Sequence, residues 1–72
     1  MPLYRANYGD GETSGAFSDI RDARLAMWSR AGIVQYRTSI ERHEGGRLDS
    51  GWFVVEPSRA TRNGPPIVER VS

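Results

Sequence analysis

Apolar and polar residues alternate along residues 3–8, so that Tyr4, Ala6 and Tyr8 fall on one side. This period of two is typical of a short strand with one buried face. The alternation then stops, and residues 9–16 consist mostly of glycine, acidic and small polar residues. Because such residues favour turns, we expect a flexible loop over 9–16.

A helix is the clearest local signal in the chain, and it is predicted from Asp19 to Ala31. Ser18 is suited to cap its N-terminus and Gly32 to stop it. Arg24 falls within the apolar arc, so its stem is expected along apolar surface, with its guanidinium at the rim or on an acidic partner. Spacing the residues by 100° gathers that arc from Ile20, Ala23, Met27, Trp28 and Ala31, with Leu25 at its margin.

Alternation returns over residues 33–42 and predicts a second strand. Thr38 and Ile40 share its inner face, whereas Arg37 and Glu41 share its outer face. The strand is therefore expected to be half-buried, with charged residues on the side away from the core.

Gly45-Gly46 is typical of a two-residue hairpin turn, which would set opposite charges against each other on the two strands. In that register Phe53 and Val55 join the core, while Trp52 points outward. A wider loop through Ser50-Gly51 is the alternative, and it changes the pairing.

Residues 57–66 hold three of the four prolines and two arginines, which predicts a connecting loop. Residues 67–71 could add a final short strand. The expected fold is a single α+β domain over 1–72, with one helix packed on an antiparallel sheet of three or four strands.

Arginine supplies all ten basic side chains of the 72-residue chain, against nine acidic ones, for a net charge of +1. The absence of lysine is also what a GC-rich genome would produce. Near-balance of charge is unlike a dedicated nucleic-acid binder. The chain has no cysteine and no long apolar run, so we expect a cytoplasmic protein without disulfides, and homodimerisation stays open as support for a small core.

No motif for catalysis, metal or cofactor binding stands out, so a non-enzymatic protein without cofactor is expected. His43 is the single histidine and follows the second strand, where a solvated turn residue is expected. The glycines of residues 9–15 lie where a phosphate loop would, but neighbouring acids and the lack of lysine argue against phosphate binding.

An outward tryptophan beside an arginine is the best candidate for a contact site, because both types are enriched at the centres of protein interfaces. The expected partner-binding residues are Arg37, Trp52, Glu41, Arg59 and Arg62. A protein partner is favoured, with direct nucleic-acid binding through Arg37, Arg59, Arg62 and Trp52 as the alternative. A further alternative is that the C-terminal residues cover Trp52.

The order of strand, loop, helix opening at Ser18-Asp19, Gly45-Gly46 hairpin and Gly51-Trp52-Phe53 strand resembles small phage and mobile-element inhibitors, in particular compact anti-CRISPR proteins that act on type I complexes. The resemblance covers most of the chain as organisation. It implies a stoichiometric blocker of a host nucleic-acid-handling complex, and it assigns no individual binding residue.

Overall fold

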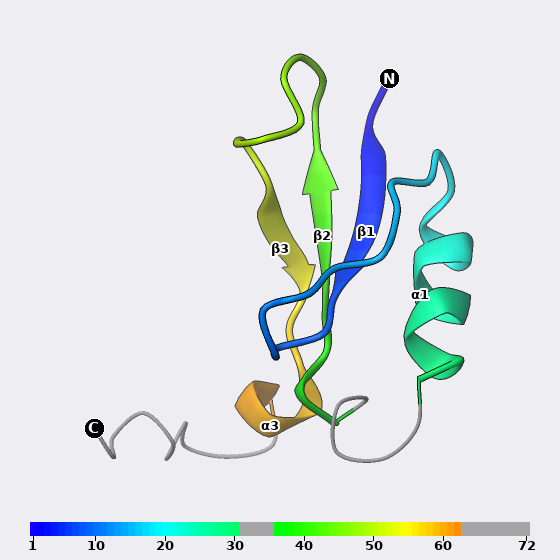
Figure 1. Ribbon diagram of the computed structural model, residues 1–72, viewed down its shortest axis with the longest axis vertical. Coiled ribbons are helices and arrows are strands. Elements are labelled where there is room, and N and C mark those ends of the chain that lie inside the picture. Colours follow the sequence, from blue (N-terminus) through cyan, green and yellow to red (C-terminus); the bar gives the residue numbers. More distant parts are fainter. Residues whose placement is uncertain (31–35, 63–72) are drawn as a thin grey trace.

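The computed structural model describes residues 1–30 and 36–62 of the chain. Its sheet has three antiparallel strands in the order β1-β2-β3, and Figure 1 shows this sheet with the main helix beside β1. The predicted α+β class is confirmed, whereas the fourth strand predicted at 67–71 lies outside the described residues. In chain order the elements are β1 (Leu3–Asn7), α1 (Ile20–Trp28), β2 (Ser39–His43), β3 (Phe53–Glu56) and α3 (Arg59–Arg62).

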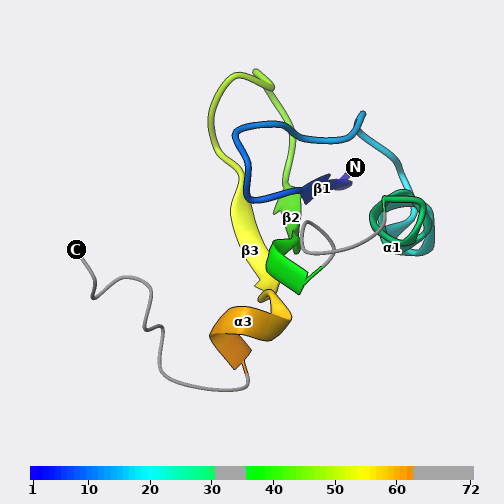
Figure 2. The ribbon, with the colours of Figure 1, turned by 60° about the horizontal axis from the view of Figure 1, so that its bottom comes forward.

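The core lies between α1 and the β1 half of the sheet. Ala6 and Ala23 are completely buried, and Ile40 is the largest side chain with almost no exposed surface. The half-buried apolar residues packed around this centre are Tyr4, Phe17, Ile20 and Met27. In Figures 1 and 2, β3 lies on the opposite side of β2 from the helix, so α1 does not cover it.

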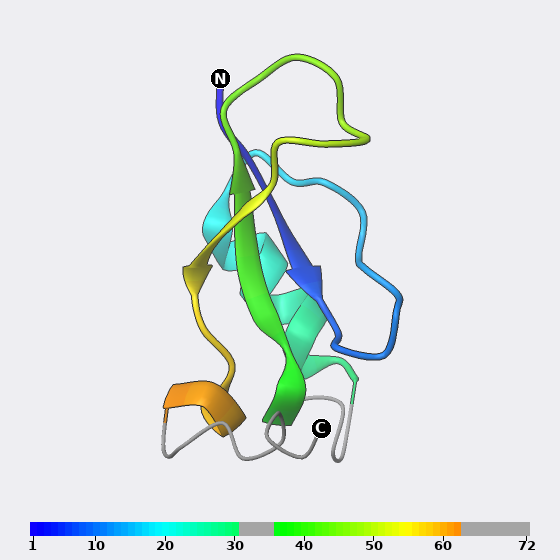
Figure 3. The same ribbon diagram turned by 90° about the vertical axis from the view of Figure 1, so that its left-hand side faces the viewer.

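Residues 12–17 run back along the outer edge of β1. Tyr4 and Phe17 exchange two backbone hydrogen bonds of 2.7 Å, and the Ser14 backbone N–H donates to the Ala6 carbonyl oxygen at 2.8 Å. Figure 3 shows the segment returning alongside β1. The predicted loop over 9–16 contains no helix or strand, and its flexibility stays a prediction.

The helix is shorter than predicted, and its cap is one residue further along. Asp19 has extended backbone geometry and accepts a hydrogen bond from the Arg21 backbone N–H at 2.9 Å, so Asp19 rather than Ser18 is the N-cap. The helix ends at Trp28, before the predicted Ala31. Trp28 and Leu25 are 57% and 58% exposed, because the narrow stripe through Ile20, Ala23 and Met27 already fills the space over β1 and β2.

The hairpin register differs from the prediction. Arg42 is paired with Phe53 and Glu41 with Val54, so the chain uses the wider loop through Ser50-Gly51 rather than a turn at Gly45-Gly46. Tyr36 and Arg37 have helical backbone geometry and precede β2, whereas the prediction placed them inside the strand.

Phe53 and Val55 were predicted to be in the core and are exposed instead. Phe53 is 47% exposed and Val55 is 37% exposed. The pairing shifts between Ile40 and Glu41, which leaves Val55 without a partner across the strand. The physical reason for the exposure is that α1 is too short and lies too far toward β1 to cover a third strand.

His43 is 2% exposed, which contradicts its prediction as a solvated turn residue. Its Nδ1 accepts from the Gly45 backbone N–H at 3.0 Å, so the ring proton is on Nε2. Nε2 lies 2.6 Å from the Arg47 carbonyl oxygen and 2.8 Å from that of Ser50. This histidine therefore organises the wide loop from within.

The predicted loop over 57–66 contains an element that the sequence did not signal. Residues Arg59–Arg62 form one helical turn, α3, directly after the end of β3. Pro57 lacks a backbone N–H and so ends the strand. Residues 63–66 lie outside the described part of the chain.

Candidate functional site

Ion pairs within the chain neutralise most of its arginines. Each of six guanidinium groups lies within 4 Å of a carboxylate, and they belong to Arg5, Arg21, Arg24, Arg30, Arg42 and Arg47. Arg37 and Arg59 are exposed and form no ion pair with any residue in the described part of the chain. Two arginines that the sequence analysis proposed for partner binding therefore carry a charge that no described carboxylate neutralises.

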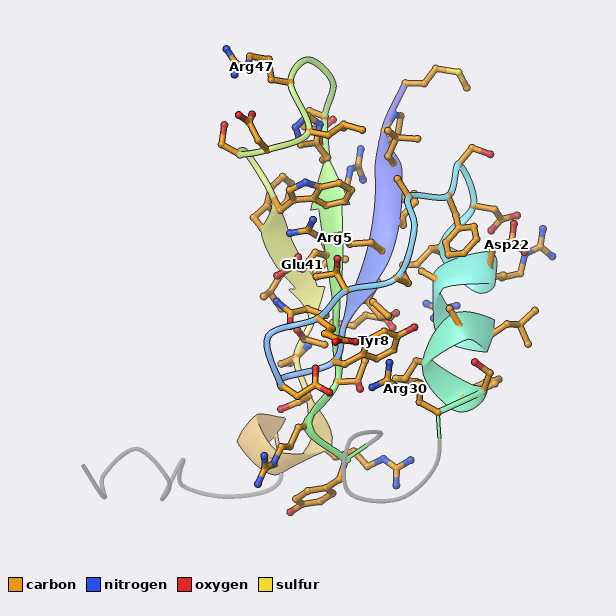
Figure 4. All side chains as sticks on the ribbon, in the orientation of Figure 1. Arg5, Tyr8, Asp22, Arg30, Glu41 and Arg47 are labelled. Carbon is orange, nitrogen blue, oxygen red and sulfur yellow. The ribbon has the colours of Figure 1, made fainter. Side chains whose placement is uncertain are left out.

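The face of the sheet away from α1 holds a closed polar cluster. Arg5 Nε donates to Glu41 Oε1 at 2.8 Å, and Asn7 Nδ2 donates to Glu41 Oε2 at 3.0 Å. Both carboxylate oxygens are thus occupied, and Glu41 is only 9% exposed. Figure 4 shows Arg5 and Glu41 next to each other over the sheet. Glu41, proposed from the sequence as a contact residue, instead holds two strands together.

Trp52 belongs to the same cluster. The Arg5 guanidinium carbon lies 4.1 Å from the centre of the Trp52 ring, and the His43 ring is 5.0 Å away. Trp52 Nε1 donates to the Leu48 carbonyl oxygen at 2.8 Å. The tryptophan is therefore held by cation–π and hydrogen-bond contacts inside the chain, and the arginine beside it is Arg5.

Arg37 and Trp52 lie at opposite ends of β2. Arg37 precedes Ser39, the first residue of the strand, whereas Trp52 contacts His43, the last residue. Four steps of a strand at roughly 3.3 Å each span about 13 Å. The structure does not bring together the tryptophan–arginine pair that the sequence suggested.

The outer edge of β3 has no strand partner among the described residues. Within the described residues, β3 pairs only with β2. Phe53, Val54 and Val55 are successive, and each is exposed, Val54 by 51%. We call this surface the β3 edge, and it consists of Phe53–Glu56. An edge strand presents unpaired backbone N–H and C=O groups that can pair with another chain.

A hollow of about 420 Å³ adjoins the β3 edge. We call it the Arg37 hollow, and its lining residues are Arg37, Ser39, Val54, Pro57 and Ser58. It combines one guanidinium without an ion pair, two serines and an apolar wall. Arg59 follows Ser58 directly and is exposed. The structure does not describe the side chain of Arg62, the last residue of α3.

Gly9 fixes the position of Arg37. A Cβ atom built on Gly9 would lie 2.9 Å from Arg37 Cβ and 3.0 Å from its carbonyl oxygen. Gly9 also has φ of +77°, a conformation that glycine adopts without strain. Close packing against Gly9 therefore sets the backbone position of Arg37, which lines the hollow.

A second hollow, of about 270 Å³, lies on α1 between Arg21, Arg24, Leu25 and Trp28. Both of its guanidinium groups are engaged, Arg21 by Asp19 and Arg24 by Glu56. The Arg21 side chain and backbone donate hydrogen bonds that lower the pKa of Asp19, and the bond to Glu56 raises the pKa of Arg24. This surface is apolar with neutralised charges, unlike the Arg37 hollow.

Sequence reasoning missed Arg5 and Ser58. Val54 was expected to point outward beside Trp52, and it is 51% exposed, but nothing in the sequence marked it as part of a hollow. Arg5 carried the same alternation signal as its neighbours, but nothing local showed that it would lie under Trp52, and Ser58 could have been found only from the path of the chain after Pro57.

The residues that the structure describes contain no group of three or more His, Asp or Glu able to hold a metal ion. Within the same part of the chain, no helix has the length and apolar character needed to cross a membrane. Comparison with known proteins found no matching family model, no matching curated protein and no matching solved structure.

Proposed function

We propose that this protein is a non-enzymatic binding module that docks a protein partner along the β3 edge. The observation that carries the proposal is the run of three exposed apolar residues on a strand whose outer side has no partner among the described residues. Partners commonly recognise such edges by adding a strand of their own, with backbone hydrogen bonds for affinity and side-chain contacts for specificity.

The specific form of this proposal is an inhibitor from a phage or mobile element that blocks a host nucleic-acid-handling complex, as in anti-CRISPR proteins. Its support is the resemblance in the order of elements described above. A stoichiometric blocker needs a docking surface and no catalytic group. The best-buried carboxylate, Glu41, has both oxygens occupied by Arg5 and Asn7, which supports a structural role for it.

Direct nucleic-acid binding is the second candidate, because Arg37 and Arg59 are exposed cations without ion pairs among the described residues. Base stacking on Trp52, which that function would use, competes with the contacts of Trp52 to Arg5 and His43. The two functions separate on salt, since each neutralised phosphate changes the log–log slope of affinity by roughly −0.9. A protein interface of mixed charge is less sensitive.

The test is affinity capture from the native host with three versions of the protein: wild type, Val54→Lys and Leu25→Lys. Val54 and Leu25 are both exposed apolar residues, at 51% and 58%, so the two variants make the same chemical change on different surfaces. We expect a partner that is retained by wild type and Leu25→Lys and lost by Val54→Lys. Loss with Leu25→Lys alone would move the interface to α1 and refute the proposal.

A further inference from the structure

We propose that the segment recognised at the β3 edge is an extended, acidic stretch of the partner protein, with a carboxylate side chain that enters the Arg37 hollow. This inference rests on the proposed function and names the chemistry of the ligand. It follows from the distribution of charge, the shape of the hollow and the end of the strand.

The charge argument begins with the acids. Among the described residues, Asp22 is the single acid without an ion pair, and it lies on the outer side of α1, pointing away from the sheet (Figure 4). The other seven are each engaged by an arginine, and they are Asp10, Glu12, Asp19, Glu41, Glu44, Asp49 and Glu56. Among the arginines whose side chains the structure describes, those without a carboxylate partner are therefore Arg37 and Arg59, beside the end of β3.

The local geometry favours a short anionic side chain carried on a strand. Val54 forms part of both the β3 edge and the hollow, so a strand paired with β3 would lie next to the hollow. Strand pairing can continue only to Glu56, because Pro57 has no backbone N–H. A partner residue at this point would turn its side chain toward Arg37, where a carboxylate accepts two hydrogen bonds from the planar guanidinium.

The backbone that carries Arg37 is packed in place before any partner arrives. It lies against Gly9 with no space for a Cβ atom, and Gly9 follows the buried Tyr8. A backbone that is already ordered loses less conformational freedom on binding, which favours a specific contact over diffuse attraction.

A peptide fits these observations better than a nucleic acid. The β3 edge offers backbone groups that match another polypeptide, and Trp52 is already stacked on Arg5. Tyr36, next to Arg37, is exposed at 45% and is an aromatic ring that a nucleic acid could use. Nucleic-acid binding is therefore an outcome that the experiment must distinguish.

The experiment is a selection from a random twelve-residue peptide display library on the folded protein. We expect enriched peptides with alternating β-branched residues and Asp or Glu at one end. By calorimetry on the most enriched peptide, Arg37→Glu should weaken binding at least about tenfold, since it replaces a bidentate attraction with repulsion. Arg47→Glu is the matched control, because Arg47 is 85% exposed at the tip of the hairpin loop and makes the same change in charge; its effect should stay within about twofold.

A charge reversal makes the assignment specific. Exchanging the acidic residue of the peptide for lysine should abolish binding to wild type and restore it to Arg37→Glu. Arg59→Glu provides a second variant at the same end of β3, and circular dichroism establishes that each variant is folded.

The outcomes distinguish this inference from the proposed function. Peptides that lose binding with Val54→Lys but show no acidic preference would overturn the inference and leave the β3 edge as the docking site. Peptides indifferent to Val54→Lys, or no enrichment at all, would overturn both. Binding of a twenty-nucleotide oligothymidine that is lost with Arg37→Glu and falls steeply with salt would assign the hollow to nucleic acid instead.

Discussion

The two edges of the sheet differ in how the chain itself covers them. At the β1 edge, residues 12–17 supply backbone partners to the strand, and Tyr4 and Phe17 exchange a pair of hydrogen bonds. At the β3 edge, Phe53–Glu56 have a strand partner on one side only within the described residues. An open edge has backbone N–H and C=O groups available to pair with another chain, whereas the backbone groups of a covered edge are already paired.

The two edges also differ in whether a nearby arginine is paired with a carboxylate. On the β1 side, Arg30 lies over the Tyr8 ring at 4.2 Å and also pairs with Asp10, so its charge is balanced within the chain. Near the β3 edge, Arg37 has no such carboxylate partner among the described residues. Exposed apolar side chains and an arginine without an ion pair to any described residue therefore lie together near the β3 edge, although Glu56 at the end of β3 is paired with Arg24 of α1.

The strongest test of this division compares two apolar residues on the same face of the sheet. Ile40→Ala should cost about 2 to 5 kcal/mol, because Ile40 is 1% exposed and leaves a cavity. Phe53→Ala should cost about 1 kcal/mol or less, because nearly half of the ring is already in water. Urea unfolding followed by circular dichroism measures both. Equal losses would mean that β3 is as well covered as β2.

The polar cluster on the other face gives the next largest effect. Glu41→Ala removes the acceptor of both Arg5 and Asn7 and leaves a guanidinium that is only 23% exposed without its carboxylate. We expect a loss of about 2 to 3 kcal/mol in unfolding free energy. Glu44→Ala, which removes the exposed partner of Arg42, should change stability by less than about 1 kcal/mol. Similar values for the two variants would contradict the structural role of Glu41.

Gly9 connects the two halves, so its replacement tests whether Arg37 is held by packing. Gly9→Ala introduces a Cβ 2.9 Å from Arg37 Cβ at φ of +77° and should cost about 2 kcal/mol. Gly11→Ala has a similar strained φ of +95° but open space around the new methyl group, and about 1 kcal/mol is expected from the backbone alone. Thermal unfolding of the pair isolates the contact, and an equal cost would mean that Gly9 does not constrain Arg37.

The smallest effect concerns the exposed pair at the start of α1. The side-chain hydrogen bond from Arg21, followed by the backbone hydrogen bond, lowers the pKa of Asp19. Because the folded-state pKa lies below the unfolded value of about 3.9, the contribution of this pair to stability is present above that pH and is lost as pH falls through the folded-state pKa. In Arg21→Ala the backbone bond stays, so an NMR titration should show the pKa of Asp19 rising only part of the way to its ordinary value. Arg47→Ala, as control, should leave it unchanged.

Local sequence signals predicted the elements near the β1 edge well. The alternation of Tyr4, Ala6 and Tyr8 defined the inner face of β1, and the apolar spacing of the helix identified Ala23 and Met27 as contact residues. The guanidinium of Arg24 was expected at the rim or on an acidic partner, and the structure pairs it with Glu56 at the end of β3. These features follow from the regular repeat of side-chain directions along a strand or a helix, which local backbone geometry sets.

The hairpin shows where such signals are insufficient. Gly45-Gly46 and Ser50-Gly51 are both turn signals, and nothing within the loop decides between them. The choice depends on His43, whose ring bonds to backbone groups of Gly45, Arg47 and Ser50. With the wide loop, Phe53 moves from beside Thr38 to beside Arg42, beyond the reach of α1.

The sequence by itself determined the α+β class, the strand near the N-terminus and the amphipathic helix, because these follow from hydrophobic periodicity. Tertiary structure alone decided which strand edge is unpaired among the described residues, that Trp52 lies on Arg5, and that Arg37 has no carboxylate partner in the same part of the chain. Those outcomes depend on which residues distant in sequence meet in space, and a guanidinium is neutralised or left available only by its neighbours in the fold.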